Sequence, residues 1–254
     1  MNDIRPGSPA DTGVAVTAKP TVVLVHGAFV DSSIWDKVIG LLARRGYPAV
    51  AVANPLRGLS SDARYTRSVL ASIQGPVVLV GHCYGGSVIS AAAAGADDVR
   101  ALVYVAGFIP DEEESAAELS MQFPGSTLGE VLREIPVGQA AEGTAAADLC
   151  VEPHAYHRHL AADLPQEVAR TMAVTQRPVS SAAWHEEAVE VAWQFIPSWA
   201  LVAGADQALA AETQIHMAER ALAYVTTVDA SHSVALSHPE AVMDVIEQAA
   251  SKTA

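Results

Sequence analysis

The stretch Val77-Val78-Leu79-Val80-Gly81-His82-Cys83-Tyr84-Gly85-Gly86-Ser87 decides the fold. Its first four residues are a short apolar run typical of a strand buried on both faces, and the alanine-rich segment after Ser87 predicts a helix. Between them, glycines stand two residues before and two residues after Cys83. This spacing is typical of a nucleophile elbow, a sharp strand-to-helix turn that exposes its central side chain. The pattern therefore predicts that Cys83 is a nucleophile.

Strand and helix patterns alternate on both sides of this turn, which predicts an α/β fold with a doubly wound, mostly parallel sheet and right-handed crossovers. The expected strands are 21–25, 50–52, 77–80, 101–105, 198–203 and 224–228, and the expected helices between them are 31–46, 60–73, 84–95, 210–222 and 239–249.

The alternation is lost between residues 111 and 197, where the patterns predict helices and no strong strand. The helices expected there are 112–120, 127–135, 165–175 and 180–193. The predicted organisation is a flexible N-terminal tail, a core in two parts, and a helical cap inserted before the last two strands. Their ranges are 1–20 for the tail, 21–110 and 198–254 for the core, and 111–197 for the cap.

Composition limits the partners. The formal net charge is −14, and the few Lys and Arg residues are scattered. Nucleic acid is therefore excluded as an expected partner, because phosphate binding needs clustered basic residues. No apolar run is long enough for a secretory signal or a membrane helix. We expect a soluble, cytoplasmic protein that acts on a small molecule; its oligomeric state is left open, with a homodimer as one option.

A nucleophile elbow requires an acid beyond a later strand and a histidine beyond the last one, in that order. Asp206 follows the expected strand 198–203, and His232 follows 224–228. We expect His232 to take the thiol proton of Cys83 and Asp206 to orient the imidazole. Asp206 alone could equally cap the next helix. The competing Asp229 is too close to His232 in sequence to come from a separate strand loop.

An acyl transfer also needs donors for the oxyanion. The elbow supplies the backbone N–H of Tyr84, and the loop after the first strand supplies that of Ala28. Substrate contacts are predicted for Phe29, His82 and Trp184, although His82 is also expected to pack or to make a structural hydrogen bond, and Trp184 to pack.

Cys150 and three nearby histidines, His154, His157 and His159, raise the question of a metal, but their spacing fits no familiar zinc pattern. No metal and no cofactor is expected. Cys83 and Cys150 are expected to be free thiols.

Four motifs carry a family resemblance when taken in order. They are Val25-His26-Gly27-Ala28-Phe29, Gly81-His82-Cys83-Tyr84-Gly85-Gly86, Gly204-Ala205-Asp206 and Ser231-His232-Ser233. Together they resemble the α/β-hydrolase superfamily, in particular its small capped esterase and hydroxynitrile-lyase-like branch. The resemblance implies that residues 111–197 roof the site and select the substrate.

The chain departs from that pattern in two places. Cysteine stands where the nucleophile is usually serine, and the Ile-Pro pair often found after the acid is missing behind Asp206. A thiol nucleophile resembles the dienelactone hydrolases and polyester synthases, whose other motifs differ from these. Cys83 is therefore a native nucleophile, an engineered replacement of serine, or the remnant of an idle site.

The expected activity is hydrolysis of a small, fairly apolar carboxylic ester, thioester or lactone through a thioacyl intermediate on Cys83. One alternative is a lyase or C–C bond hydrolase in which His232 acts as a base on the substrate. Another is a small-molecule binder with little turnover.

Overall fold

The computed structural model describes residues 19–139 and 145–253. Most of the predicted tail, residues 1–18, lies outside this part of the chain. Six parallel strands form the main sheet in the order β2-β1-β3-β4-β8-β9. The strands are β1 (Thr21–Val25), β2 (Ala49–Val52), β3 (Val77–His82), β4 (Val99–Val105), β8 (Ser198–Ala203) and β9 (Tyr224–Val228). The predicted α/β fold with a mostly parallel sheet is confirmed.

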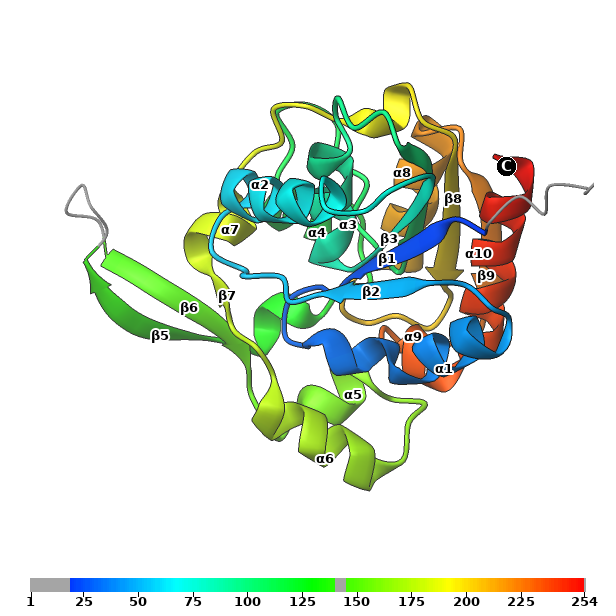
Figure 1. Ribbon diagram of the computed structural model, residues 1–254. Coiled ribbons are helices and arrows are strands. Elements are labelled where there is room, and N and C mark those ends of the chain that lie inside the picture. Colours follow the sequence, from blue (N-terminus) through cyan, green and yellow to red (C-terminus); the bar gives the residue numbers. More distant parts are fainter. Residues whose placement is uncertain (1–18, 140–144, 254) are drawn as a thin grey trace, which may run out of the picture.

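Helices cover both faces of this sheet (Figure 1). One apolar cluster joins the sheet to η1 (Ser32–Trp35), α1 (Asp36–Arg44), α9 (Val234–Ser237) and α10 (Pro239–Lys252). The other joins it to α2 (Leu59–Leu70), α3 (Tyr84–Ala92) and α8 (Ala211–Arg220). Strand β3 contributes Val78 and Val80 to the first cluster and Val77 and Leu79 to the second. Since alternate side chains of a strand point to opposite faces, a continuous apolar run suits this central position.

The segment between β4 and β8 differs from the prediction. Its helices are α4 (Ala116–Ser120), α5 (Tyr156–Leu160), α6 (Gln166–Thr175) and α7 (Ser181–His185), with 3₁₀ turns η2 (Leu128–Glu130) and η3 (Ala192–Gln194). It also contains an antiparallel sheet in the order β5-β6-β7, made of β5 (Leu132–Gln139), β6 (Ala145–Val151) and β7 (Val179–Ser180). The expectation of an all-helical cap is therefore wrong, whereas the predicted helix 165–175 corresponds to α6.

The error is clearest at residues 127–135, where a helix is predicted and the structure turns from η2 into β5. Pro136, within β5, cannot continue a helix, and pairing with β6 satisfies the backbone instead. The β5–β6 pair extends away from the main sheet (Figure 1). Within the described residues, no helix combines the length and apolar character needed to cross a membrane.

Candidate active site

Cys83 occupies a one-residue turn between β3 and α3. Its backbone has φ 51° and ψ −127°, an unusual conformation for a residue with a side chain. The carbonyl of Cys83 accepts two hydrogen bonds that hold the turn, from the N–H of Gly86 at 2.9 Å and from that of Phe108 at 3.1 Å. Cys83 is thus fixed where β3 ends and α3 begins.

The glycines around Cys83 let backbones approach closely. A Cβ on Gly81 would lie 2.5 Å from the carbonyl oxygen of Gly85, and a Cβ on Gly85 would overlap the carbonyl oxygen of Val25. A Cβ on Gly86 would overlap that of Phe108. The motif is therefore required by packing between β3, α3 and the neighbouring strand ends.

Asp206 and His232 meet because β8 and β9 are neighbours and the loops after both strands leave the same edge of the sheet. His232 Nδ1 lies 2.6 Å from Asp206 Oδ2, and both side chains are buried. A carboxylate can only accept, so the proton of this bond belongs to Nδ1. The structure brings these two predicted residues together, while Asp229 is exposed.

The Asp206 carboxylate is held by further donors. Oδ1 accepts the N–H groups of Ala208 at 2.8 Å and Leu209 at 3.0 Å, and Oδ2 accepts Nε2 of Gln214 at 2.9 Å. Asp206 therefore also organises the turn that leads into α8, but it does not cap this helix as the alternative reading expected, since the N-cap position is Ala210. Gln214 was missed by sequence reasoning, because a glutamine in an amphipathic helix carries no signal that its side chain turns inward to a carboxylate.

The electrostatics of His232 favour its charged form. Burial disfavours the imidazolium, but the Asp206 carboxylate, the neighbouring Cys83 side chain and the short hydrogen bond outweigh this effect, so the pKa of His232 is raised well above its ordinary value. Among the described residues, Nε2 of His232 has no nitrogen or oxygen partner, and the neighbouring side chain is that of Cys83. One ring nitrogen is thus fixed by a carboxylate and the other is left available.

His82 packs behind His232. Its Nε2–H donates to the backbone carbonyl of His232 at 2.9 Å, and the two rings are 4.8 Å apart between centroids. Its other side meets Trp35 edge-on at 6.2 Å. Complete burial lowers the pKa of His82 to about 3, so the ring is neutral. These contacts are structural, and the predicted substrate contact of His82 finds no support in them.

The loop after β1 lies directly against the elbow. A Cβ on Gly27 would overlap Cβ of Cys83 and would lie 3.1 Å from the backbone nitrogen of Tyr84. Gly27, the residue before Ala28, thus lies directly against Cys83 and the backbone of Tyr84. The N–H groups predicted to stabilise an oxyanion are those of Ala28 and Tyr84.

Phe29 follows in the left-handed conformation, with φ 63°. Its N–H donates to the carbonyl of Arg177 at 3.0 Å, and its carbonyl accepts the hydroxyl of Tyr156 at 2.8 Å. Both partners come from the segment between β4 and β8. Contacts from that segment therefore hold the loop that contains Ala28, and the role of Tyr156 was missed by sequence reasoning.

Trp184, in α7, contributes to an aromatic group beside this loop. Its ring lies 6.1 Å from that of Phe29 and meets Phe108 edge-on at 5.6 Å. Trp184 also borders a cavity of about 750 Å³, whose other walls include Ala117, Leu128, Leu132 and Leu149. Two of the three predicted substrate contacts, Phe29 and Trp184, are thus adjacent, and Trp184 borders a cavity with both apolar and polar walls.

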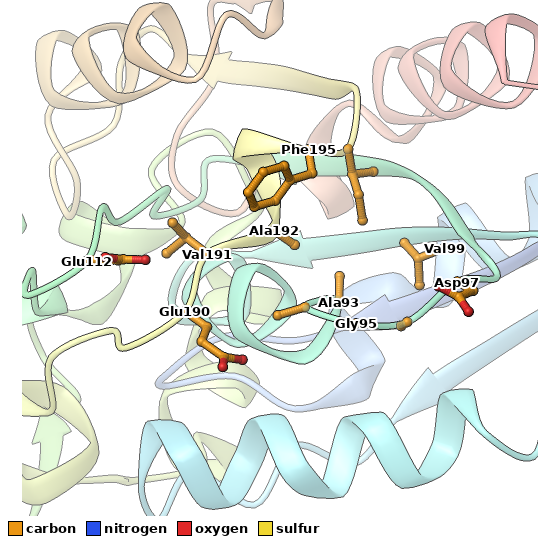
Figure 2. A pocket seen from close by; sticks show the side chains of 12 residues that line it. Ala93, Gly95, Asp97, Val99, Glu112, Glu190, Val191, Ala192 and Phe195 are labelled. Atoms are coloured by element: carbon orange, nitrogen blue, oxygen red, sulfur yellow. The ribbon is translucent and has the colours of Figure 1, made fainter.

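A second pocket, of about 650 Å³, lies at the other end of α3 from Cys83 (Figure 2). It is bordered by Ala93 and Gly95 just beyond α3, and by Val191 and Phe195. Because α3 begins at Tyr84 and spans about 13 Å, this pocket is separate from the elbow.

Two of the three histidines near Cys150 have hydrogen-bond partners of another kind. His159 Nδ1 pairs with the Thr127 hydroxyl at 2.7 Å, and His157 Nε2 with the Leu164 carbonyl at 2.9 Å. Within residues 19–139 and 145–253, no group of three or more metal-ligating side chains is placed to hold an ion. Cys83 and Cys150 are both buried and free.

Comparisons with known proteins agree with this architecture. The model of a family described as "Alpha/beta hydrolase family" matches residues 22–245. A probable hydrolase, R7, from a Phoma species is 29% identical over 254 residues, which cover 91% of this chain and 98% of that protein.

Among solved structures, polyneuridine aldehyde esterase is similar with a TM-score of 0.78 at 20% identity, covering 91% of this chain and 98% of that one. Tomato methylketone synthase I in complex with 2-tridecanone has a TM-score of 0.77 at 20% identity, covering 93% and 99%. A pyrethroid hydrolase from Sphingobium faniae has a TM-score of 0.73 at 21% identity, covering 91% of this chain and 97% of that one. At these identities the likeness is one of fold.

Proposed function

The chain belongs to the alpha/beta hydrolase family, and we propose that it hydrolyses a small, fairly apolar carboxylic ester, thioester or lactone through a thioacyl intermediate on Cys83. The observation that carries the proposal is the free Nε2 of a buried His232, whose Nδ1 is bound to Asp206, beside a cysteine on a strained strand-to-helix turn. A nucleophile, a base and an orienting acid are the three parts that such a mechanism needs.

In the first step, Sγ of Cys83 bonds to the substrate carbonyl carbon while its proton is held by Nε2 of His232. The tetrahedral intermediate then expels the alcohol or thiol, which takes that proton. In the second step, water attacks the thioacyl carbon, His232 accepts its proton, and the acid leaves as Sγ regains a hydrogen. Asp206 keeps Nδ1 protonated and offsets the positive charge on the ring throughout.

The oxyanion of both steps would be stabilised by the N–H groups of Ala28 and Tyr84. The close approach of Gly27 to Cys83 supports this assignment, since it brings the two backbones together. Each donor is expected to stabilise the transition state by about 2.7–4 kcal/mol.

The aromatic surroundings support a small apolar substrate. Phe29 and Trp184 pack against each other, and Trp184 borders a cavity whose wall combines apolar side chains with polar ones, among them Glu130 and Glu134. With a net charge of −14, the protein as a whole repels anions. An uncharged acyl compound therefore fits better than a carboxylate or phosphate.

The test is to react the protein with short aryl esters, aryl thioesters and lactones and to follow both product and intact mass. We expect an initial burst of the leaving group, an acyl adduct on Cys83, and loss of the adduct with turnover. Cys83→Ala should lose activity by several orders of magnitude. Cys150→Ser removes the other buried free thiol and should leave turnover unchanged.

Other outcomes separate the alternatives. Turnover that survives Cys83→Ala would contradict the covalent mechanism and favour His232 acting as a base on the substrate. No adduct, no turnover and slow alkylation of Cys83 by iodoacetamide would contradict the hydrolase proposal and favour a binding protein. A Cys83→Ser variant that gains activity would indicate a site inherited from serine, whereas a collapse would indicate a site built for sulfur.

A further inference from the structure

The loop that carries His232 is attached to the segment just after α5. The N–H of Ser231 donates to Oδ2 of Asp163 at 3.0 Å, and the Ser231 hydroxyl donates to Oδ1 of the same carboxylate. On the other side of His232, the N–H of Ser233 donates to the carbonyl of Leu160 at 2.9 Å. The two neighbours of His232 are thus bound to residues only three positions apart.

Asp163 is an anion at neutral pH. Partial burial favours its neutral form, but the two hydrogen bonds from Ser231 outweigh this effect and lower the pKa of Asp163 below its ordinary value. Nδ1 of His238 lies 3.7 Å from Oδ2 of Asp163. Hydrogen bonds to an ionised acceptor are stronger than neutral ones, so the Ser231 contacts hold the loop more firmly than ordinary turn contacts would.

Building on the function proposed above, we propose that Asp163 is a positioning residue that acts through Ser231 on the ring of His232. Other contacts help to fix this ring and its loop: Asp206 binds Nδ1, His82 binds the backbone carbonyl, and Leu160 binds the N–H of the next residue. On the N-terminal side, Ser231 is held by its two contacts with Asp163 and by a longer one, 3.3 Å, from its hydroxyl to the carbonyl of Leu160. Without the Asp163 contacts, the loop can shift while the bond to Asp206 survives, and Nε2 moves relative to Cys83.

The consequence for catalysis is a loss in kcat with little change in KM. Asp163 contacts the loop that carries His232 and is not expected to contact the substrate. Binding of the substrate in the ground state should therefore be unaffected. Proton transfer between Cys83 and His232 depends on their alignment, and small misplacements of reacting groups lower rates steeply. We expect Asp163→Asn, which keeps the shape but removes the charge and one acceptor oxygen, to lower kcat by about 10- to 100-fold.

The test compares Asp163→Asn with Ser231→Ala and with the double variant. Both changes remove the bond between the Ser231 hydroxyl and Asp163, whereas the N–H of Ser231 still reaches Asp163 in Ser231→Ala. The double variant should therefore be little worse than Asp163→Asn alone. The matched control is Asp148→Asn. Asp148 is a part-buried carboxylate of the same segment, but it pairs with Arg57 at 2.7 Å and not with the His232 loop. His238→Asn tests the other neighbour of Asp163. Both controls should keep kcat within about twofold.

A second readout needs no substrate. The proton on Nδ1 of His232, in a 2.6 Å bond to Asp206, should give a far-downfield NMR signal that shifts or broadens in Asp163→Asn and stays in place in Asp148→Asn. The proposal is overturned if this signal and kcat are unchanged in Asp163→Asn, or if only the melting temperature falls. If the wild-type protein lacks Cys83-dependent turnover, the proposed function fails, and the NMR signal still decides whether Asp163 positions His232.

Discussion

Cys83 combines an unusual backbone with a fixed environment. A non-glycine residue at φ 51° costs about 1–3 kcal/mol, and the two N–H groups bound to its carbonyl help to retain that conformation. The close contacts at Gly27 and Gly86 involve only backbone and Cβ atoms. They would therefore be the same with serine in place of Cys83. The geometry of the turn is therefore independent of the sulfur, and only chemistry at Sγ distinguishes a native thiol from a replaced hydroxyl.

The first prediction concerns the acid partner of His232. Asp206→Asn keeps the size of the side chain but removes the charge that holds Nδ1 protonated, so we expect kcat to fall by about 10³- to 10⁴-fold. Asp229→Asn, in the same loop as His232 but exposed, is the matched control and should keep full activity. Steady-state kinetics on an ester substrate measures both. Equal losses in the two variants would remove Asp206 from the mechanism.

The second prediction concerns stability and pH. The pKa of His232 is raised in the folded protein against about 6.5 in the unfolded chain. Its ionisation therefore contributes stability that is complete below about pH 6.5 and is lost as the pH rises through the folded value. The difference in unfolding free energy between wild type and His232→Gln should shrink between about pH 6 and pH 10 in denaturant titrations. A difference that grows over this range would show the opposite sign of shift.

At the scale of elements, α5 connects two loops of the site. Tyr156, its first residue, binds the carbonyl of Phe29, and Leu160, its last, binds the N–H of Ser233. One short helix of the segment between β4 and β8 thus contacts the loop after β1 at its first residue and the loop after β9 at its last. The segment between β4 and β8 therefore helps to hold two loops of the site in place, and it also borders a cavity.

The third prediction follows from this connection. Tyr156→Phe leaves a buried carbonyl without its donor and should lower stability by about 1–3 kcal/mol. It should also lower kcat/KM at least severalfold, because the loop of Ala28 loses a support. Tyr104→Phe removes an equally buried hydroxyl that pairs with Ser90 at 2.8 Å inside the core, and should lower stability alone. The idea fails if the two variants have the same kinetics.

The fourth prediction concerns the contact between β1 and the elbow. A methyl group at Gly27 would overlap Cys83 and lie 2.6 Å from the carbonyl oxygen of His82, so the loop must shift. Gly27→Ala is expected to lower kcat by more than about 100-fold. The control is Gly40→Ala in α1, where the nearest atom is 3.6 Å from the added Cβ and helix propensity favours alanine by about 1 kcal/mol. An active, stable Gly27→Ala protein would exclude the proposed oxyanion arrangement.

At the scale of the whole molecule, an ion pair links α8 to the chain that leaves β4. Both terminal nitrogens of Arg220 bind Glu114, at 2.6 and 2.7 Å, and one also donates to the carbonyl of Ile109 at 2.9 Å. Such a two-pronged pair is geometrically specific. It fixes the start of the segment between β4 and β8 against the helix that follows Asp206.

The fifth prediction tests this link. Burial favours the neutral carboxyl of Glu114, but the Arg220 contacts outweigh it and lower the pKa of Glu114. The pKa of Glu114 is therefore lower in the folded protein than in the unfolded chain. Its ionisation contributes stability that is present above about pH 4.5 and is lost as the pH falls through the folded pKa. Glu114→Gln should destabilise the protein by about 1 kcal/mol at pH 7 and by much less at pH 3, as measured by urea unfolding. A pH-independent difference would rule out the charge as its source.

The sequence was informative where the signals are local. Runs such as Val77 to Val80 predict strands, and the glycines around Cys83 predict a turn, because each pattern is read within a few residues. Strand β5 was not predicted, because its hydrogen bonds are made with β6 and the residues around Leu132 locally favour a helix.

By itself, the sequence determined the α/β class, the succession of the main-sheet strands along the chain and the place of Cys83, Asp206 and His232 after strand ends. The tertiary structure alone decided which side chains hold them. Asp163 and Ser231 are 68 positions apart in sequence, and Tyr156 and Phe29 are 127 apart. No local pattern encodes such pairs, because they arise only when the sheet and the segment between β4 and β8 pack together. The motifs around Cys83, Asp206 and His232 are therefore readable in the chain, while their alignment is a property of the folded molecule.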